Sequence, residues 1–180
     1  MSAHKRKITQ YIGDAKARYV LATEGERPLL VIGLNPSKAD DQSSDQTFSK
    51  VLGFAERAGF DGIMMMNLYP QRATQPKQLH KRRNSQFHQN NLNHLHKILV
   101  QNRDIQILAA WGAGLEIRKY LSVCLNDIYQ ISQNYDCKWL QIGQLTKQGH
   151  PRHPSRTAYA LGLNPFELEE YLISIVQGKY

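Results

Sequence analysis

The chain contains the stretch Pro28-Leu29-Leu30-Val31-Ile32-Gly33-Leu34-Asn35-Pro36-Ser37, in which an unbroken apolar run gives way to a short polar loop. A strand that is apolar at every position is typical of the centre of a parallel sheet, where helices cover both faces. We therefore predict a buried central strand over 28–34, followed by a loop at its carboxyl end. In open α/β sheets, ligands bind in the crevice outside such strand ends.

A second loop of the same kind lies far along the chain. Its sequence is Gly149-His150-Pro151-Arg152-His153-Pro154-Ser155, and it follows the apolar run 139–143. Proline restricts the backbone of both loops, and both carry polar side chains. We predict that the two loops form opposite walls of one crevice.

The rest of the chain alternates between predicted strands and helices. Two more apolar runs predict strands over 63–69 and 105–111, which makes four strands, and apolar residues at helical spacing lie between them. Asn164-Pro165-Phe166-Glu167 is typical of the start of a last helix. Crossovers of this length favour parallel pairing. The predicted fold class is α/β, a three-layer α/β/α sandwich around a mostly parallel sheet of about four strands.

The N-terminal region is predicted to lie at the margin of this sheet. Residues 1–16 are polar and charged, and we expect a loose arm or a short helix there. Residues 18–23 predict a strand, and the turn-like segment 24–27 favours a hairpin between this strand and strand 28–34. The length of 180 residues is that of a single domain over 1–180.

Composition limits the classes of function. The formal net charge is +8, and an excess of Lys and Arg raises the affinity for polyanions. We therefore expect nucleic acid (DNA) or a nucleotide as partner, although a basic surface that only keeps the protein in solution remains the alternative. No run approaches the roughly 20 apolar residues of a membrane helix, and no signal-like segment follows the basic N-terminus. Because the two cysteines make no disulfide framework, a cytoplasmic location is expected.

The strand-end loops supply the candidate site residues. Asn35 can donate and accept hydrogen bonds, and His153 can move a proton or donate to a developing negative charge, so these two are the candidate catalytic residues. The alternative is that Asn35 only caps its own turn and that His153 is a surface residue. The candidate substrate-binding residues are Gly33, Leu34, Pro36, Ser37, Asn67, Tyr69, Trp111 and Ser155. The candidate nucleic-acid-binding residues are Arg72, Lys147, Arg152 and Arg156, next to the basic run 81–83.

No metal or cofactor is expected. His150 and His153 are three residues apart, but no Cys or carboxylate at metal-ligand spacing accompanies them. The acidic residues Asp40, Asp41 and Asp45 are more typical of a solvated loop that ends in a helix cap than of a cation site.

Other catalytic signatures are also missing from the sequence. His88, His94 and His96 do not share one helical face, and we expect them to face solvent. The chain has neither a phosphate-binding loop nor a nucleophile elbow at a serine.

Most of the chain, from about residue 18 to residue 156, resembles the bacterial family known as domain of unknown function 1643. The resemblance lies in four motifs: Leu34-Asn35-Pro36-Ser37-Lys38-Ala39-Asp40, Asn67-Leu68-Tyr69 with Arg72-Ala73-Thr74, Ala110-Trp111-Gly112, and Thr146-Lys147 through Gly149 to His153-Pro154.

The order of these motifs is also similar, more distantly, to that of the uracil-DNA glycosylase superfamily, whose fold is an α/β/α sandwich with a parallel sheet. Gly33-Leu34-Asn35-Pro36 looks like its first motif, in which the asparagine positions the attacking water. His153-Pro154-Ser155 looks like its second motif, whose histidine stabilises negative charge on the base. Asn67 resembles a position between the two motifs. Such enzymes flip a base out of the duplex and cleave its glycosidic bond.

This resemblance implies a nucleobase-recognising N-glycosidic hydrolase that acts on DNA or nucleosides. The alternatives are a non-catalytic nucleic-acid or nucleotide-binding module of the same fold, and a hydrolase or transferase of small molecules. The sequence departs from the motifs of this superfamily in three ways. Ser37 replaces the usual glycine, Arg156 follows the second motif without the apolar wedge, and the two cysteines cannot supply a four-cysteine iron–sulfur site.

Overall fold

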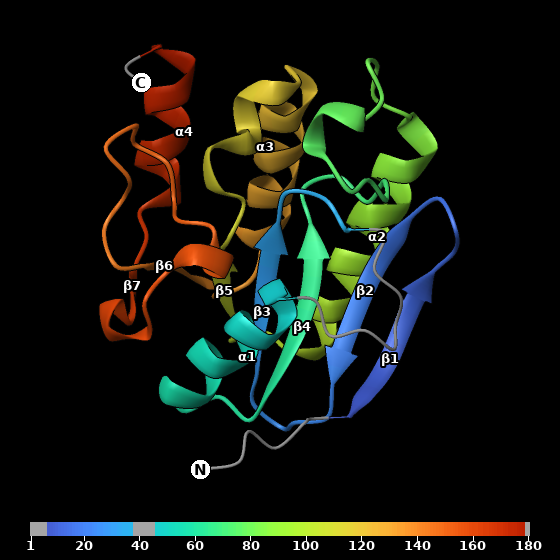
Figure 1. Cartoon of the computed structure of the whole chain (residues 1–180). Coiled ribbons are helices and arrows are strands. Elements are labelled where there is room, and N and C mark those ends of the chain that lie inside the picture. Colours follow the sequence, from blue (N-terminus) through green and yellow to red (C-terminus); the bar gives the residue numbers. More distant parts are fainter. Residues whose placement is uncertain (1–6, 38–45, 179–180) are drawn as a thin grey trace.

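The computed structural model describes residues 7–37 and 46–178, and a seven-stranded sheet in the order β1-β2-β4-β3-β5-β6-β7 runs through its centre (Figure 1). The α/β class is therefore as predicted. The strands are β1 (Ile8–Gly13), β2 (Arg18–Thr23), β3 (Pro28–Gly33), β4 (Gly62–Asn67), β5 (Gln106–Ala109), β6 (Lys138–Ile142) and β7 (Leu163–Pro165).

The four predicted strands form the middle of this sheet. β3 pairs in parallel with β4 and with β5, and β5 pairs in parallel with β6. The chain leaves β3 toward β4 on one side and later reaches β5 on the other side. The carboxyl end of β3 is therefore the point where the strand order reverses, which is where open α/β sheets bind ligands.

The whole sheet is larger and more mixed than the predicted sheet of about four mostly parallel strands. β1 pairs with β2, β2 with β4, and β6 with β7, and all three of these pairings are antiparallel. The outer strands β1 and β7 were not predicted from the sequence, because edge strands are short and need not be apolar.

The predicted hairpin between 18–23 and 28–34 is wrong. Both segments are strands, but β4 lies between them, with Leu21 of β2 opposite Met65. The turn that follows β2 is fastened to the start of β4 instead, since the backbone N–H groups of Glu26 and Arg27 donate to the Asp61 carboxylate at 3.0 and 2.7 Å.

The expected arm or helix over 1–16 is also wrong for the part that the structure describes. Residues 8–13 form the edge strand β1, in which Ile12 pairs with Val20 of β2. The turn into β2 is fixed by Asp14, whose carboxylate accepts the backbone N–H groups of Lys16 at 2.7 Å and Ala17 at 2.9 Å. These hydrogen bonds stabilise the charged form and lower the pKa of Asp14.

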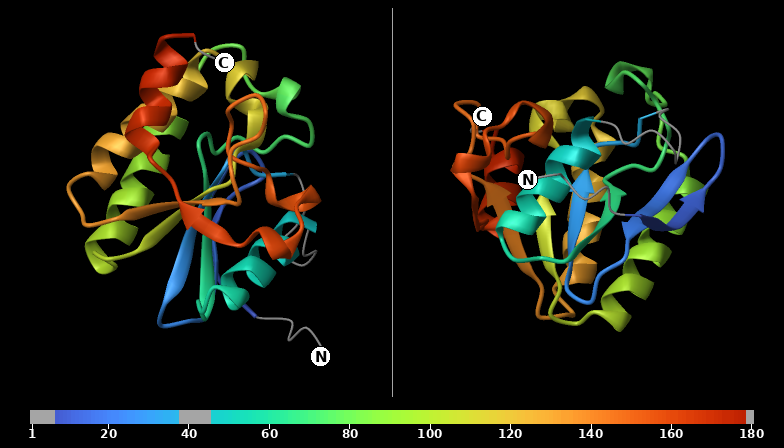
Figure 2. Two further views of the ribbon diagram at one scale, coloured as in Figure 1. Left: turned by 90° about the vertical axis from the view of Figure 1, so that its left-hand side faces the viewer. Right: turned by 60° about the horizontal axis from the view of Figure 1, so that its bottom comes forward.

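Helices cover both faces of the sheet. α1 (Gln46–Arg57) lies on one face, and α2 (Ser85–Gln101), α3 (Tyr120–Ser132) and α4 (Leu168–Val176) lie on the other (Figure 2). Four short 3-10 helices complete the described elements: η1 (Pro76–Gln78), η2 (Gly112–Ile117), η3 (Pro154–Arg156) and η4 (Tyr159–Leu161). None of the helices in these ranges has the length and hydrophobicity that a bilayer crossing requires.

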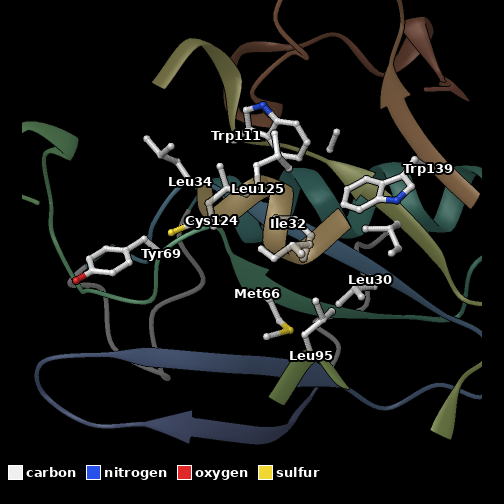
Figure 3. Packing of buried hydrophobic residues seen from close by; sticks show 14 of the residues in the cluster. Leu30, Ile32, Leu34, Met66, Tyr69, Leu95, Trp111, Cys124, Leu125 and Trp139 are labelled. Carbon is white, nitrogen blue, oxygen red and sulfur yellow. The ribbon is translucent and has the colours of Figure 1, made fainter. Parts of the chain in front are cut away.

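Successive strand residues point to opposite faces, so the sheet carries two separate apolar clusters. On the α1 face, Val31 and Met65 pack with Phe54 of the helix. On the other face, Ile32 and Met66 pack with Leu95 of α2 and with residues of α3 and α4 (Figure 3).

Two further predictions need correction. The segment 164–167 does not begin the last helix: Asn164 lies in β7 opposite Gln141, and α4 starts at Leu168. His88 does not face solvent, because it is 5% exposed and its Nε2 lies 2.8 Å from Oδ2 of Asp127 on α3. A buried imidazole needs such a partner, and this partner is 39 residues away in the sequence.

Candidate functional site

A cavity of about 370 Å³ lies at the carboxyl ends of β3, β4 and β5, on the face that α1 covers. Its volume falls within the range of about 300–1,000 Å³ that is usual for small-molecule sites. The described residues that line it are Arg18, Val31, Gly33, Leu34, Asn35, Ser37, Thr47, Val51, Met65, Asn67, Ala73, Thr74, Pro76, Ala110, Trp111, Gly112, Ala113, Gly114 and His153.

The loop after β3 is held against the loop after β4. The carbonyl oxygens of Gly33, Leu34 and Pro36 accept the backbone N–H groups of Leu68, Tyr69 and Ala73 at 2.8, 3.1 and 3.0 Å, respectively. These bonds extend the parallel pairing of the two strands beyond the end of the sheet. They fix the backbone that carries the side chains of one cavity wall.

Asn35 lies in this wall with its amide group held in one orientation. Its Nδ2 donates to the carbonyl oxygens of Pro36 at 3.0 Å and Ala73 at 2.9 Å. Because a carbonyl can only accept, the amino group must face these two atoms. The remaining atom, Oδ1, is therefore the group of Asn35 that can accept a hydrogen bond from a water molecule or a ligand.

Asn67, the last residue of β4, brings a second amide to the cavity. The residue is only 4% exposed, and within 7–37 and 46–178 its side chain makes no hydrogen bond to the protein. Its Oδ1 lies so close to Gly33 that a Cβ atom there would stand 2.7 Å away, so any larger residue at position 33 would displace this amide. Neither polar atom of this amide is among the fully buried side-chain atoms that lack a partner, so the amide is open to the cavity, where a ligand or water can bond to it.

His153 also lines the cavity. The Nδ1 atom of its ring accepts the backbone N–H of Ser155 at 3.3 Å and lies 2.9 Å from the Ser155 hydroxyl. A nitrogen that accepts from an N–H carries no proton, so the proton of the neutral ring is on Nε2. Gly112, at φ +63°, lets the loop after β5 approach, since a Cβ atom there would lie 3.1 Å from Cβ of His153.

A buried hydrogen-bond network supports this second loop from behind. His150 is 3% exposed, and its Nδ1 lies 2.8 Å from the Tyr171 hydroxyl of α4. The same hydroxyl accepts the indole N–H of Trp111 at 3.3 Å, while Glu116 stands 3.8 Å from Nε2 of His150. His150 therefore belongs to a buried hydrogen-bond network, whereas His153 lines the cavity.

The predicted substrate-binding residues fall into two groups. The cavity is lined by Gly33, Leu34, Ser37, Asn67 and Trp111, together with the two candidate catalytic residues. Pro36, Tyr69 and Ser155 are not among the described lining residues. Ser155 instead contacts the His153 ring, and Pro36 holds Asn35 through its carbonyl group.

Tyr69 lies in the core on the other face of the sheet. It is fully buried, and its hydroxyl accepts the backbone N–H of Asn84 at 2.9 Å and lies 3.0 Å from Nδ1 of His80. Burial raises the pKa of Tyr69, so the phenol stays protonated. The residue organises the segment before α2 and offers no face to the cavity.

The predicted basic residues lie outside the cavity. Lys147 and Arg156 are exposed, and Arg152 donates from Nε to the Gln144 carbonyl at 3.1 Å. Arg72 contacts β1 and the turn after it, since its Nη1 donates to the Tyr11 hydroxyl at 2.7 Å and to the Asp14 carbonyl at 3.2 Å. None of these four residues is among the described residues that line the cavity.

Several residues that line the cavity were not predicted from the sequence. Arg18 and Thr47 have no motif around them, and Arg18 reaches the cavity only because β2 pairs with β4. The acidic candidates Asp40, Asp41 and Asp45 lie outside the described residues. Within those ranges, no group of three or more His, Cys, Asp or Glu residues is arranged to hold a metal ion.

The loop that carries Asn35 and the loop that carries His153 both lie within the range of one protein-family model. Residues 18–155 match the model of the family described as "Protein of unknown function (DUF1643)", a range that includes both walls of the cavity. The chain belongs to this family. Comparisons with curated proteins and with solved structures found no match. The family range begins at Arg18 and ends two residues after His153, so the described cavity-lining residues all lie inside it.

Proposed function

We propose that the cavity binds a nucleobase and that the protein hydrolyses the N-glycosidic bond of a nucleoside, a nucleotide or a DNA strand. The observation that carries this proposal is Asn67, which is 4% exposed, lines the cavity and makes no side-chain hydrogen bond within residues 7–37 and 46–178. An amide offers a donor and an acceptor side by side, which matches the hydrogen-bonding edge of a base.

Both candidate catalytic residues, Asn35 and His153, line this cavity, which supports the proposal. Asn35 Oδ1 would accept from the attacking water, because Nδ2 is held by two backbone carbonyls. His153 would donate from Nε2 to the departing base, because its Nδ1 already accepts from Ser155. The water oxygen bonds to C1′, the C1′–N bond breaks with its electron pair moving to the base, and the proton lost by the water ends on the base.

One observation favours a second candidate, a module that binds the same ligand without cleaving it. Among the described residues that line the cavity, none is a carboxylate that could act as a general base. The fold and the recognition by Asn67 would be the same in this case, and only product formation separates the two candidates.

The deciding experiment measures release of free base from nucleosides, 5′-mononucleotides, and single-stranded and duplex DNA carrying uracil, hypoxanthine or mismatches. Wild-type protein should release base, and Asn35→Ala and His153→Ala should each lower the rate by about 10²–10⁴-fold. His96→Ala is the matched control, because His96 is exposed on α2 on the other side of the sheet.

Binding without release by folded wild-type protein would exclude hydrolysis and support the module. Salt dependence then separates the partners, because binding to a polynucleotide weakens steeply with salt, whereas a small neutral ligand is little affected. Failure of every base-containing ligand to bind would contradict both candidates.

A further inference from the structure

Charged side chains are unevenly distributed between the two ends of the sheet. One end is where the parallel strands finish, toward which the arrows of β3 and β4 point in Figure 1. The described segments that connect elements at this end are 14–17, 34–37, 68–84, 110–119 and 143–162. They contain two acidic side chains, Asp14 and Glu116, and eleven cationic ones. The cationic residues are Lys16, Arg72, Lys77, Lys81, Arg82, Arg83, Arg118, Lys119, Lys147, Arg152 and Arg156.

The opposite end of the sheet has the reverse balance. The described connecting residues there are 7, 24–27, 58–61, 102–105, 133–137 and 166–167. They contain three cationic residues and six acidic ones, which are Glu24, Glu26, Asp61, Asp104, Asp136 and Glu167. The segment 38–45 lies outside the described residues; it contains one lysine and three aspartates, fewer charges than the excess of nine cations at the first end. The described chain therefore has a positive end, where the parallel strands finish, and a negative end.

Six cationic side chains at the positive end are available to a partner. They are exposed and make no hydrogen bond or ion pair within residues 7–37 and 46–178, and they belong to Lys77, Lys81, Arg82, Lys119, Lys147 and Arg156. Other cations at this end are already engaged: Arg118 donates to the Leu79 carbonyl, for example, at 2.9 Å. Exposed cations of one sign create a potential that attracts a polyanion.

The segments that carry these six cations also line the cavity. Pro76 lines it and is followed directly by Lys77, Gly114 lines it from segment 110–119, and His153 lines it from segment 143–162. Because the strand order is β4-β3-β5-β6, these segments leave the sheet on both sides of β3. A long anion bound across the positive end would therefore pass over the cavity.

The spread of the cations favours a polymer over a small anion. Six cations on three separate segments are more than the single phosphate group of a mononucleotide can contact, whereas a nucleic-acid backbone carries a charge at every phosphate. The acidic residues of the negative end would repel the same backbone. The two ends together orient the protein so that its cavity faces the strand.

We propose that the positive end of the sheet binds the phosphodiester backbone of a nucleic-acid strand. This inference rests on the proposed function and narrows the source of the bound base from a free nucleoside or nucleotide to a strand. Single strands and duplexes share this backbone chemistry, and the experiment below distinguishes them.

The test measures the fluorescence anisotropy of a labelled single-stranded oligonucleotide and of its duplex with the full chain over a range of salt concentrations. Three to six phosphate contacts predict a slope of log K against log salt of about −2 to −4 for the single strand. Affinity should then fall about tenfold or more between roughly 50 and 200 mM salt. The tighter of the two oligonucleotides identifies the form of the strand, and a 5′-mononucleotide should compete only weakly.

Paired substitutions make the test specific to the positive end. Lys81→Gln with Arg82→Gln, and Lys147→Gln with Arg156→Gln, should each make the slope shallower by about 1 and lower affinity about fivefold or more. The matched control is Arg27→Gln with Arg103→Gln, which removes the same charge from exposed residues at the negative end. It should bind within about twofold of wild type. None of these exposed side chains is buried in the core, so the variants should fold, which circular dichroism verifies.

An equal loss of affinity in the control and in the two positive-end pairs would reduce the effect to net charge and overturn the proposal. Equal affinity for mononucleotide and strand would also overturn it and leave the proposed function standing. Binding to anionic phosphatidylserine vesicles but not to oligonucleotides would assign the surface to a membrane instead. Strand binding without release of base would leave this inference standing and exclude hydrolysis.

Discussion

Buried polar groups on the two faces of the sheet have different surroundings. On the face covered by α2, α3 and α4, the Tyr171 hydroxyl bonds to both the Trp111 indole and the His150 imidazole. On the α1 face, the Asn67 amide is equally buried, but it borders a cavity and has no partner in the described chain.

This difference separates polar residues that build the structure from those that serve a ligand. The hydrogen bonds of a buried polar group are normally made within the protein. The position of such a group is then explained by the fold. The Asn67 amide is different because it is open to a cavity, where a ligand could bond to it. We expect substitutions on the closed face to change stability, and substitutions on the cavity face to change binding.

The largest effect on stability is expected at Leu95 of α2, which is fully buried against the closed face (Figure 3). Leu95→Ala should lower the free energy of unfolding by about 2–5 kcal/mol, because it leaves a void in a packed cluster. Val51→Ala should cost clearly less, since Val51 is also fully buried but already borders the open cavity. Urea unfolding curves of both variants measure the difference, and equal losses would contradict it.

An intermediate effect is expected at Tyr171. Tyr171→Phe removes the hydroxyl that joins Trp111 and His150, and should lower the free energy of unfolding by about 1–3 kcal/mol, because two buried groups lose a partner. Tyr135→Phe is the control and should stay within about 0.5 kcal/mol, because Tyr135 is a partly exposed residue outside the network.

The same substitution tests whether the network positions the His153 loop. If it does, base release by Tyr171→Phe should fall at a temperature where the variant is fully folded. A variant with unchanged activity under those conditions would show that the network only stabilises the fold.

Much of the site could be predicted from the sequence because it follows from chain topology. Apolar runs identified β3, β4, β5 and β6, and parallel strands place their carboxyl ends together. Strand order therefore predicts the site residues Asn35, Asn67, Trp111 and His153, and all four line one cavity in the structure.

The other features of the site depend on contacts between residues far apart in the sequence, which a local sequence pattern does not predict. Arg18 lines the cavity because β2 pairs with β4, a strand that follows it by about 40 residues. Tyr69 was expected in the crevice because it ends an apolar run, yet its side chain packs in the cluster on the opposite face from Asn67. His88 is buried because Asp127 of a different helix lies beside it.

The smallest effect on stability is expected at the centre of the cavity. Asn67→Ala removes an amide that makes no hydrogen bond within the described chain, so the free energy of unfolding should stay within about 1 kcal/mol of wild type. The matched comparison is Thr23→Val, because Thr23 is also 4% exposed and its hydroxyl accepts the Ile63 N–H at 3.0 Å. This second variant should lose about 1–3 kcal/mol, since it leaves a buried N–H without a partner.

Ligand binding should show the reverse order. Asn67→Ala should lose base binding by about tenfold or more in isothermal titration, whereas Thr23→Val, at the other end of the sheet, should bind as wild type does. If Asn67→Ala were as destabilised as Thr23→Val, the amide would have to be a structural group. The contrast between the two faces would then no longer identify the binding site.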